Sequence, residues 1–193
     1  EGSWEWAVYN GAIEYAIATN AGGWAWVATN ALVPSNSWSH VAWVKNGTSM
    51  KFYVNGALAD DTKTTGQTTT ASNDPFTIGG RVVNADRYIG GMDEHKLWNT
   101  ARTATQIALD MHSYGDGVGP NFLDDSSLVG YYDFNEGTNA SAQIFDRTTN
   151  AIHVAVVSGA TKPTYSDIKT TAVLGGDTVY TFPRSYITPV GGW

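Results

Sequence analysis

Residues 38–56 read WSHVAWVKNGTSMKFYVNG, and this stretch decides the fold. Apolar and polar residues alternate on both sides of Asn46-Gly47, and Asn55-Gly56 closes the second run. An Asn-Gly pair between alternating runs is the strongest short-range signal of a β-hairpin, because a type I′ turn needs positive φ at both central positions. The stretch therefore predicts three consecutive antiparallel strands joined by two tight turns.

The rest of the chain follows the same short alternation. Residues 61–75 are rich in threonine, and we expect them to form an exposed loop or a ragged edge strand. The gaps between runs are mostly short and helices do not alternate with strands, which favours an all-β, two-sheet antiparallel sandwich. The expected strands are 4–8, 13–19, 24–29, 41–45, 50–54, 57–60, 76–80, 95–98, 128–134, 143–146 and 153–159.

One segment departs from the strand pattern. From Thr103, the run TATQIALDMHSY places Ile107, Met111 and Tyr114 at helical spacing, and Thr103 with Gln106 forms a capping box. We expect a single short helix here. The last stretch, residues 161–193, has a different composition and is expected to be a linker or the start of another element.

Composition excludes several functional classes. The 193 residues carry a net charge of −7 and no basic stripe, so we expect no nucleic-acid binding. No apolar run approaches the roughly 20 residues that span a bilayer, so we expect no membrane insertion. The chain has no cysteine, which rules out disulfides, thiolate zinc sites and cysteine nucleophiles.

Three separate motifs point to one family. The hairpin at 38–56, the segment GGMDEHKLWNTARTATQI at 90–107 and the segment LVGYYDFNEGTNASAQIFDRTTN at 128–150 stand in the family's order. Together they resemble the laminin G-like domains of the concanavalin A-like lectin and glucanase group, which are jelly-roll sandwiches. The resemblance covers residues 1–165. Its fold-signature positions here are Trp38, His40, Asn55, Gly56 and Arg102.

The chain departs from the family pattern at both ends. Members begin with strands that precede the region matching 4–19, and this sequence lacks them. An incomplete sandwich has an unpaired edge, so we expect the missing strands to be supplied by preceding polypeptide, by a neighbouring subunit or by the C-terminal tail. Residues 166–193 form an extension beyond the resemblance, and its segment 179–187 (VYTFPRSYI) is a candidate for that role.

Catalytic chemistry finds little support in the sequence. His40 has no second ligand or carboxylate at useful spacing, so we interpret it as part of the fold rather than as a general base. Glycanases of this architecture place carboxylates at E-x-D-x-x-E spacing on one strand face, and no such spacing occurs. Glu5 and Glu14 lie on separate strands without a partner motif. We therefore expect no enzyme activity.

Two binding features remain as hypotheses. Calcium prefers six to eight oxygen ligands, and Asp93, Glu94 and Asp146 are candidates for a calcium site. The alternative is that Asp93 or Glu94 caps the following turn or pairs with Arg102, which is itself expected to pin the helix to the sheet. Trp24 and Trp26 alternate on one strand and are candidates for a sugar-stacking platform, because aromatic faces bind sugar rings.

The resemblance implies a non-catalytic recognition or adhesion domain in an extracellular, cell-surface or virion-surface setting. Its partner would be a glycan or a protein bound at a rim loop, with calcium as a structural ion. One alternative is a structural subunit of a filament, surface layer or virion, and a second is a divergent glycoside hydrolase.

Overall fold

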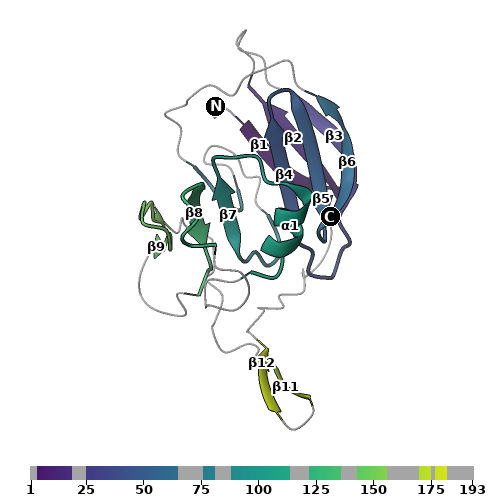
Figure 1. Cartoon of the computed structure of the whole chain (residues 1–193). Coiled ribbons are helices and arrows are strands. Elements are labelled where there is room, and N and C mark those ends of the chain that lie inside the picture. The colour runs from purple at the N-terminus through teal and green to yellow at the C-terminus, as the bar shows by residue number, and fades with distance from the viewer. Residues whose placement is uncertain are drawn as a thin grey trace.

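The structure is a computed structural model that describes residues 4–18, 25–64, 76–80, 88–113, 122–135, 143–155, 170–174 and 177–181. These residues form antiparallel sheets and one helix (Figure 1), which confirms the predicted fold class. The strands are β1 Trp4–Tyr9, β2 Ala12–Ile17, β3 Trp26–Leu32, β4 Val41–Asn46, β5 Ser49–Val54, β6 Ala57–Thr64, β7 His95–Trp98, β8 Leu128–Tyr132, β9 Gln143–Ile144, β10 Val154–Ala155, β11 Thr170–Leu174 and β12 Asp177–Thr181, and the helix is α1 Ala104–Asp110.

Tight turns set the register of the main hairpins. β1 pairs with β2 from Tyr9↔Ala12 onward, so the loop is Asn10-Gly11, and both residues have positive φ (48° and 77°). Asn55-Gly56 joins β5 to β6 in the same way, with φ of 51° and 76°. These are the backbone angles that a type I′ turn requires.

The turn between β4 and β5 lies one residue later than the sequence pattern predicts. Asn46 pairs with Ser49, so the two loop residues are Gly47 and Thr48. Gly47 has a φ of 58° at the first loop position, which is the glycine placement of a type II′ turn. Asn46 is therefore the last residue of β4 and not one of the two turn residues.

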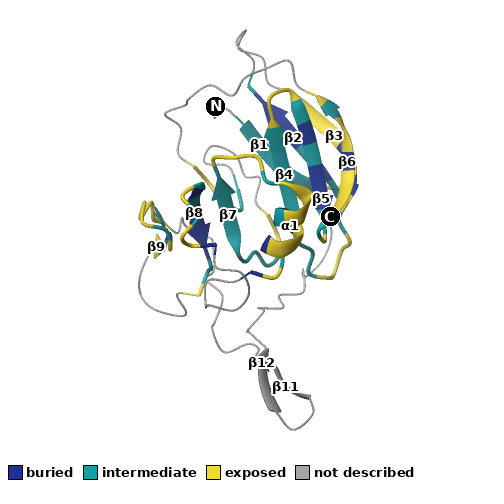
Figure 2. Ribbon diagram, in the orientation of Figure 1, coloured by how far each residue is buried: buried dark blue, intermediate teal, exposed yellow. Residues whose placement is uncertain are grey.

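Two three-stranded sheets pack face to face. The sheet β1–β2–β3 lies behind the sheet β4–β5–β6 in Figure 1, and Figure 2 shows buried residues along β2 and β5 between them. Alternate residues of β2 point into this interface and meet alternate residues of β5. The buried core consists of Ile13, Tyr15, Ile17, Ala31, Met50 and Phe52.

Aromatic rings fill the centre of this core. Tyr15 stacks on Phe52 with ring centroids 5.4 Å apart, and Phe52 lies parallel to Trp43 at 6.3 Å. Trp4 meets the edge of Trp43 at 5.5 Å. Offset and edge-to-face contacts of this kind add to the free energy gained from burying apolar area. Trp4 and Trp6 of β1 both pack against this core, so Glu5 between them lies on the opposite face of the sheet.

Asp60 closes the edge where the two sheets meet at β3 and β6. Its side chain is 4% exposed, and its Oδ2 accepts a hydrogen bond from the backbone N–H of Asn30 at 2.7 Å. The Oδ1 accepts from the N–H and the hydroxyl of Thr62. Burial alone would raise the pKa of Asp60, but these hydrogen bonds hold it below its usual value. An inward-pointing carboxylate of this kind protects an edge strand from unwanted pairing.

The helix is confirmed with its predicted cap. The backbone N–H of Thr103 donates to Gln106 Oε1 at 2.9 Å, and the N–H of Gln106 donates to Thr103 Oγ1 at 3.3 Å. α1 packs on the β5–β6 turn, because a Cβ added at Gly56 would lie 3.5 Å from Ala108 Cα. The signature Asn-Gly turn therefore supports the helix.

The predicted strands at 76–80 and 143–146 differ from the structure. The strand expected at 76–80 is wrong, because Phe76–Ile78 has no strand pairing and Gly79 turns the chain with a φ of 78°. The Phe76 ring instead packs between Trp4 and Tyr132, at 6.4 and 6.3 Å. The predicted strand 143–146 shortens to β9. Of the predicted strand 153–159, Val154–Ala155 forms β10 and residues 156–159 lie outside the described residues. The segment expected at 61–75 as a loop or edge strand begins as the end of β6 up to Thr64, and residues 65–75 lie outside the described residues.

The C-terminal stretch contains a hairpin of its own. β11 pairs with β12, and among the described residues neither strand pairs with another sheet. The first three residues of the proposed edge-filling segment 179–187 belong to β12, and the remaining six lie outside the described residues. The division of the chain into a domain at 1–165 and an extension at 166–193 stays a prediction.

Candidate functional site

The signature histidine joins the two ends of the β4–β5 hairpin. The backbone N–H of His40 donates to Asn55 Oδ1 at 3.0 Å, and the N–H of Asn55 donates to the carbonyl of His40 at 2.8 Å. Burial, aided by the nearby charge of Lys96, lowers the pKa of His40 to about 4. The imidazole is therefore neutral near pH 7, and its backbone fixes the hairpin.

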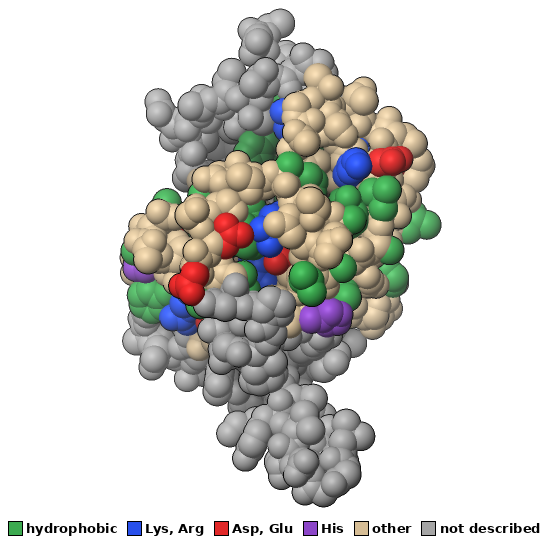
Figure 3. Space-filling view, in the orientation of Figure 1, with side chains coloured by type: hydrophobic (Ala, Val, Ile, Leu, Met, Phe, Trp, Pro, Cys, Tyr) green, Lys and Arg blue, Asp and Glu red, His purple; other side chains and the backbone are tan. Residues whose placement is uncertain are grey.

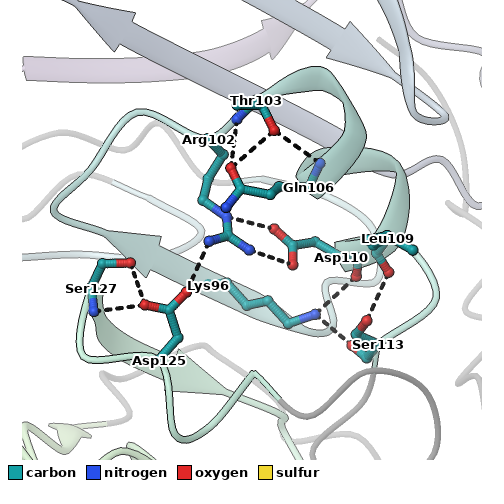
Figure 4. A network of polar contacts seen from close by, with 9 residues as sticks. All are labelled: Lys96, Arg102, Thr103, Gln106, Leu109, Asp110, Ser113, Asp125 and Ser127. Carbon is teal, nitrogen blue, oxygen red and sulfur yellow. Dashed lines mark hydrogen bonds and ion pairs between the residues drawn. The ribbon is translucent and has the colours of Figure 1, made fainter.

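The signature arginine anchors α1 to the strand before it (Figure 4). The Arg102 guanidinium donates two hydrogen bonds to the Asp110 carboxylate, both at 3.1 Å, and one to Asp125 Oδ2 at 3.0 Å. The central guanidinium carbon, Arg102 Cζ, lies 3.8 Å from the ring centre of Trp98, so the guanidinium also stacks on the indole. Bidentate and stacked contacts suit Arg and cannot be copied by Lys.

Lys96 fills the space next to this pair. Its Nζ donates to the carbonyls of Asp110 and Ser113, and it lies 4.3 Å from the ring centre of Phe122. Figure 3 shows acidic and basic side chains close together in the middle of this face. The contacts tie β7 to the end of α1, and every cation in Figure 4 already has acceptors within the fold.

Glu94 is a partly buried acid next to Lys96. Tyr131 Oη donates to Glu94 Oε2 at 2.7 Å, and Lys96 Nζ lies 4.0 Å from the same oxygen. Burial raises the pKa of Glu94 to about 7, although the Tyr131 hydrogen bond and Lys96 oppose the shift. Its backbone has a φ of 55°, which is strained for a residue with a side chain. The predicted alternative of a Glu94–Arg102 pair is not found, while Asp93 does accept the N–H of Glu94.

The calcium site predicted at Asp93, Glu94 and Asp146 stays a prediction, and the structure shows the present contacts of Asp146. Both oxygens of Asp146 already accept hydrogen bonds, from the backbone of Tyr131, Thr148 and Ile152 and from the Thr148 hydroxyl. Calcium requires several oxygens with free lone pairs. The part of the chain that the structure describes holds no group of three or more His, Cys, Asp or Glu suited to a metal ion. Calcium binding stays a prediction.

The predicted aromatic platform is described only in part. Trp24 lies outside the described residues, while Trp26 begins β3 and its side chain is 39% exposed. Trp26 pairs with Ala16 of β2, and Ala16 pairs with Glu5 of β1. Because β2 directs Tyr15 into the core, its neighbour Ala16 and the residues paired with it lie on the outer face of the sheet.

Three cross-strand rows make up this outer face. Two further aromatic or apolar side chains are well exposed on it, Tyr9 at 53% and Leu32 at 70%, and small residues lie between them. We call the nine residues the outer face of β1–β2–β3. They are Glu5, Ala16 and Trp26 in the first row, Ala7, Glu14 and Ala28 in the second, and Tyr9, Ala12 and Leu32 in the third.

The outer face of β1–β2–β3 carries an exposed aromatic side chain near each end. Tyr9 and Trp26 lie in rows four residues apart, which is about 13 Å along the strands. Ala7, Ala12 and Ala28 keep the floor low between them, while Ala16 is fully buried and is not open to solvent. Glu5 and Glu14 lie one row apart on neighbouring strands. The face therefore has two aromatic side chains, with Glu14 in the row between them.

Sequence reasoning found only part of this site. It identified Trp26 as a candidate and considered Glu5 and Glu14 solely as an isolated catalytic pair, while it did not consider Tyr9. The signal was present in Asn10-Gly11, because a two-residue turn fixes the pairs Tyr9↔Ala12 and Ala7↔Glu14.

Within the described residues, no helix is long and apolar enough to cross a membrane.

Comparisons with known proteins agree with this architecture. Neither the curated proteins nor the solved structures contain a match to the chain. A laminin G family model, described as the concanavalin A-like lectin/glucanases superfamily, matches residues 1–108, which is more than half of the chain. Members of such a family are carbohydrate- or protein-binding modules, and the group also includes glycosidases. The chain belongs to the concanavalin A-like lectin/glucanase superfamily.

Proposed function

We propose that the domain is a non-catalytic recognition module that binds a glycan on the outer face of β1–β2–β3. One observation carries the proposal: Trp26 and Tyr9 remain 39% and 53% exposed near opposite ends of a sheet face on which alanines lie between them. Aromatic side chains present an apolar face on which the C–H surface of a sugar ring can stack. Exposed apolar surface bounded by polar groups is a general mark of a binding site.

The arrangement favours binding over chemistry. Glycoside hydrolysis needs two carboxyl groups on opposite sides of the scissile bond, with one of them held as a proton donor by its surroundings. Burial raises the pKa of Glu94 to about 7, as such a donor requires, but its carboxyl group already accepts from Tyr131 and lies 4.0 Å from Lys96. Glu5 and Glu14 instead project from one sheet face, alongside a ligand stacked there. An extracellular or surface setting, in keeping with the family, would give this face access to glycans.

Isothermal titration calorimetry with short neutral oligosaccharides tests the proposal, with and without a calcium chelator. The wild-type domain should bind at least one of them, and Trp26→Ala should weaken binding by about 10-fold, because a stacked aromatic contact is worth roughly 1–2 kcal/mol. Leu58→Ala is the matched control, because Leu58 is 48% exposed on the outer face of the other sheet. An equal loss in both variants would place the binding elsewhere, and release of reducing sugar would establish a hydrolase.

A second candidate function, assembly with a neighbouring polypeptide, has its own observation. Among the described strands β4 pairs only with β5, and β7 only with β8. In the described residues, the buried side-chain nitrogens and oxygens without a hydrogen-bond partner all lie between residues 38 and 43: Trp38 Nε1, Ser39 Oγ, His40 Nδ1 and Trp43 Nε1. Buried polar groups normally have partners, so a strand added along β4 would supply acceptors where they are lacking.

Light scattering across a concentration series separates this candidate from the first. An assembly module should form dimers or larger species as its concentration rises, with hydrogen exchange slowing at β4. A molecule that stays monomeric at every concentration, with fast exchange at β4, would contradict the assembly function without affecting the glycan proposal.

A further inference from the structure

We infer that the strand added along β4 is β12 of a second copy of this chain, delivered antiparallel to β4 by the C-terminal hairpin β11–β12; this inference rests on the second candidate function, assembly. Assembly requires a donor segment and an acceptor edge. The described residues contain one of each.

One long edge of β4 has no strand beside it in the described residues. β4 and β5 are joined by a two-residue turn, so every second residue of β4, counted back from Asn46, exchanges backbone hydrogen bonds with β5. The backbone N–H and C=O groups of the residues between them, Val41, Trp43 and Lys45, are therefore directed away from β5. β4 contains no proline and a single charge, so this edge has little protection against a further strand.

Side-chain groups at the same edge also lack partners. The indole N–H of Trp43 is buried without a hydrogen bond, as are Trp38 Nε1, Ser39 Oγ and His40 Nδ1 just before β4. An indole nitrogen is a donor only, so both tryptophans lack an acceptor. Buried donors without acceptors cost free energy, which an added segment that carries carbonyl and hydroxyl groups would recover.

The hairpin β11–β12 has unpaired edges of its own. Its two strands pair with each other, and with no other strand that the structure describes. A two-stranded hairpin is at best marginally stable in water and gains stability from a third strand. The strand sequences, TTAVL and DTVYT, are rich in β-branched residues and contain neither proline nor lysine. The hairpin is therefore suited to add to a sheet edge.

The position of the hairpin favours pairing between copies. Figure 1 shows β11–β12 beyond one end of the domain, apart from β4. Within one copy the donor and the acceptor thus stay separate. Each chain then offers one hairpin and one open edge, so mutual exchange closes a symmetric dimer, whereas one-way donation builds an open chain of copies.

Charge selects β12 and its direction. β4 carries one charge, Lys45, whose Nζ donates to the carbonyl of Gly47 at the end of the strand. β12 carries one charge, Asp177, and β11 carries none. An antiparallel arrangement brings Asp177 to the end of β4 that holds Lys45, and opposite charges on neighbouring strands attract.

The hairpin pattern then fixes which residues meet. Two residues separate β11 from β12, so the backbone groups of Thr178 and Tyr180 are directed away from β11. These groups must meet the outward groups of β4. The register that overlaps all five residues of β12 with β4 places Thr178 opposite Lys45 and Tyr180 opposite Trp43. The hydroxyl groups of β12 are acceptors of the kind that the indole N–H groups lack.

Paired proline variants of the full chain test the donor. Tyr180→Pro removes a backbone N–H that the pairing with β4 uses, while the hydrogen bonds between β11 and β12 remain. Thr171→Pro is the matched control, because Thr171 lies opposite Tyr180 in the hairpin and its N–H is directed to the other edge. In light scattering across a concentration series, Tyr180→Pro should weaken association by at least about 10-fold, the effect of one lost hydrogen bond, while Thr171→Pro should associate like the wild type.

Single-cysteine variants map the contact, because the chain has no cysteine of its own. In the proposed register Val44 and Val179 form a pair without mutual backbone hydrogen bonds, whose Cα atoms lie about 4.5 Å apart and within disulfide range. Val44→Cys mixed with Val179→Cys under mild oxidation should give a cross-linked heterodimer. Ala59→Cys, at an exposed position of β6, mixed with Val179→Cys should not.

The outcomes separate the donor segment from assembly itself. Oligomers that persist in Tyr180→Pro, or equal losses in Tyr180→Pro and Thr171→Pro, would overturn the hairpin as donor and leave the assembly function in place. A monomer in which Val44→Cys and Val179→Cys together close an internal disulfide would overturn pairing between copies. A wild-type chain that stays monomeric at every concentration would overturn the assembly function and the inference with it, and would leave the glycan proposal untouched.

Discussion

The Arg102 ion pairs should be the most costly polar contacts to remove from this domain. Arg102 is 11% exposed and Asp110 is 9% exposed, and their bidentate bonds measure 3.1 Å. Arg102→Ala leaves the Asp110 carboxylate buried without its cation. Removing one partner of a buried pair costs about 3–5 kcal/mol. For a domain of this size, that corresponds to a drop in Tm of roughly 6–20 °C.

A matched arginine at the surface provides the control. Arg147 bonds both oxygens of Asp133 at 3.0 Å, but its side chain is 36% exposed. Exposed pairs contribute about 0–1 kcal/mol, so Arg147→Ala should shift the urea midpoint far less than Arg102→Ala. Similar bond lengths with different burial therefore predict clearly different losses of stability.

Two further variants test why the arginine is needed. Arg102→Lys keeps the charge but loses the bidentate geometry and the stacking on Trp98, so it should fall between wild type and Arg102→Ala. The double variant Arg102→Met with Asp110→Leu should recover much of the lost stability, since no buried charge is left alone. Urea unfolding followed by circular dichroism measures all of them, and a loss under about 1 kcal/mol for Arg102→Ala would refute the reasoning.

Three other predictions concern stability. The pKa of Glu94 is about 7 in the folded state, above its unfolded value, so the folded protein holds a proton that the unfolded chain releases. The free energy of unfolding should therefore fall by up to about 3 kcal/mol as pH rises from about 4.5 to 8. Glu94→Gln should remove this pH dependence in urea titrations at pH 5 and 8. Asp60→Ala should cost about 1–3 kcal/mol by leaving the Asn30 N–H unpaired, with faster hydrogen exchange along β3 as the readout. Gly56→Ala and Gly47→Ala should each cost about 1 kcal/mol from positive φ, and a much larger loss for Gly56 would show that its contact with α1 dominates.

Local signals predicted the framework of the fold. Asn-Gly turns need particular φ values, and the capping box of Thr103 and Gln106 satisfies backbone donors within four residues, so both are visible in a short window of sequence. The segment HKLW became β7 at the expected residues. The error at 76–80 has a tertiary cause, because the Phe76 ring packs between Trp4 and Tyr132, far away in sequence.

The site depended on long-range information. Sequence alternation showed that Trp26 faces one side of its strand, but it did not show which side meets the core. The burial of Ile13 and Tyr15 between the sheets settles that question, and Tyr9 and Glu14 then fall on the outer face. The burial of Glu94 was also hidden, because its partner Tyr131 lies 37 residues away.

The most direct test of glycan binding at the outer face is an NMR titration of the labelled domain with a short neutral oligosaccharide. The account predicts that resonances of Trp26, Tyr9 and Glu14 shift together and saturate, while the indole signal of Trp43 in the core stays in place. Shifts concentrated around Glu94, or no shifts at all at ligand concentrations in the millimolar range, would contradict it.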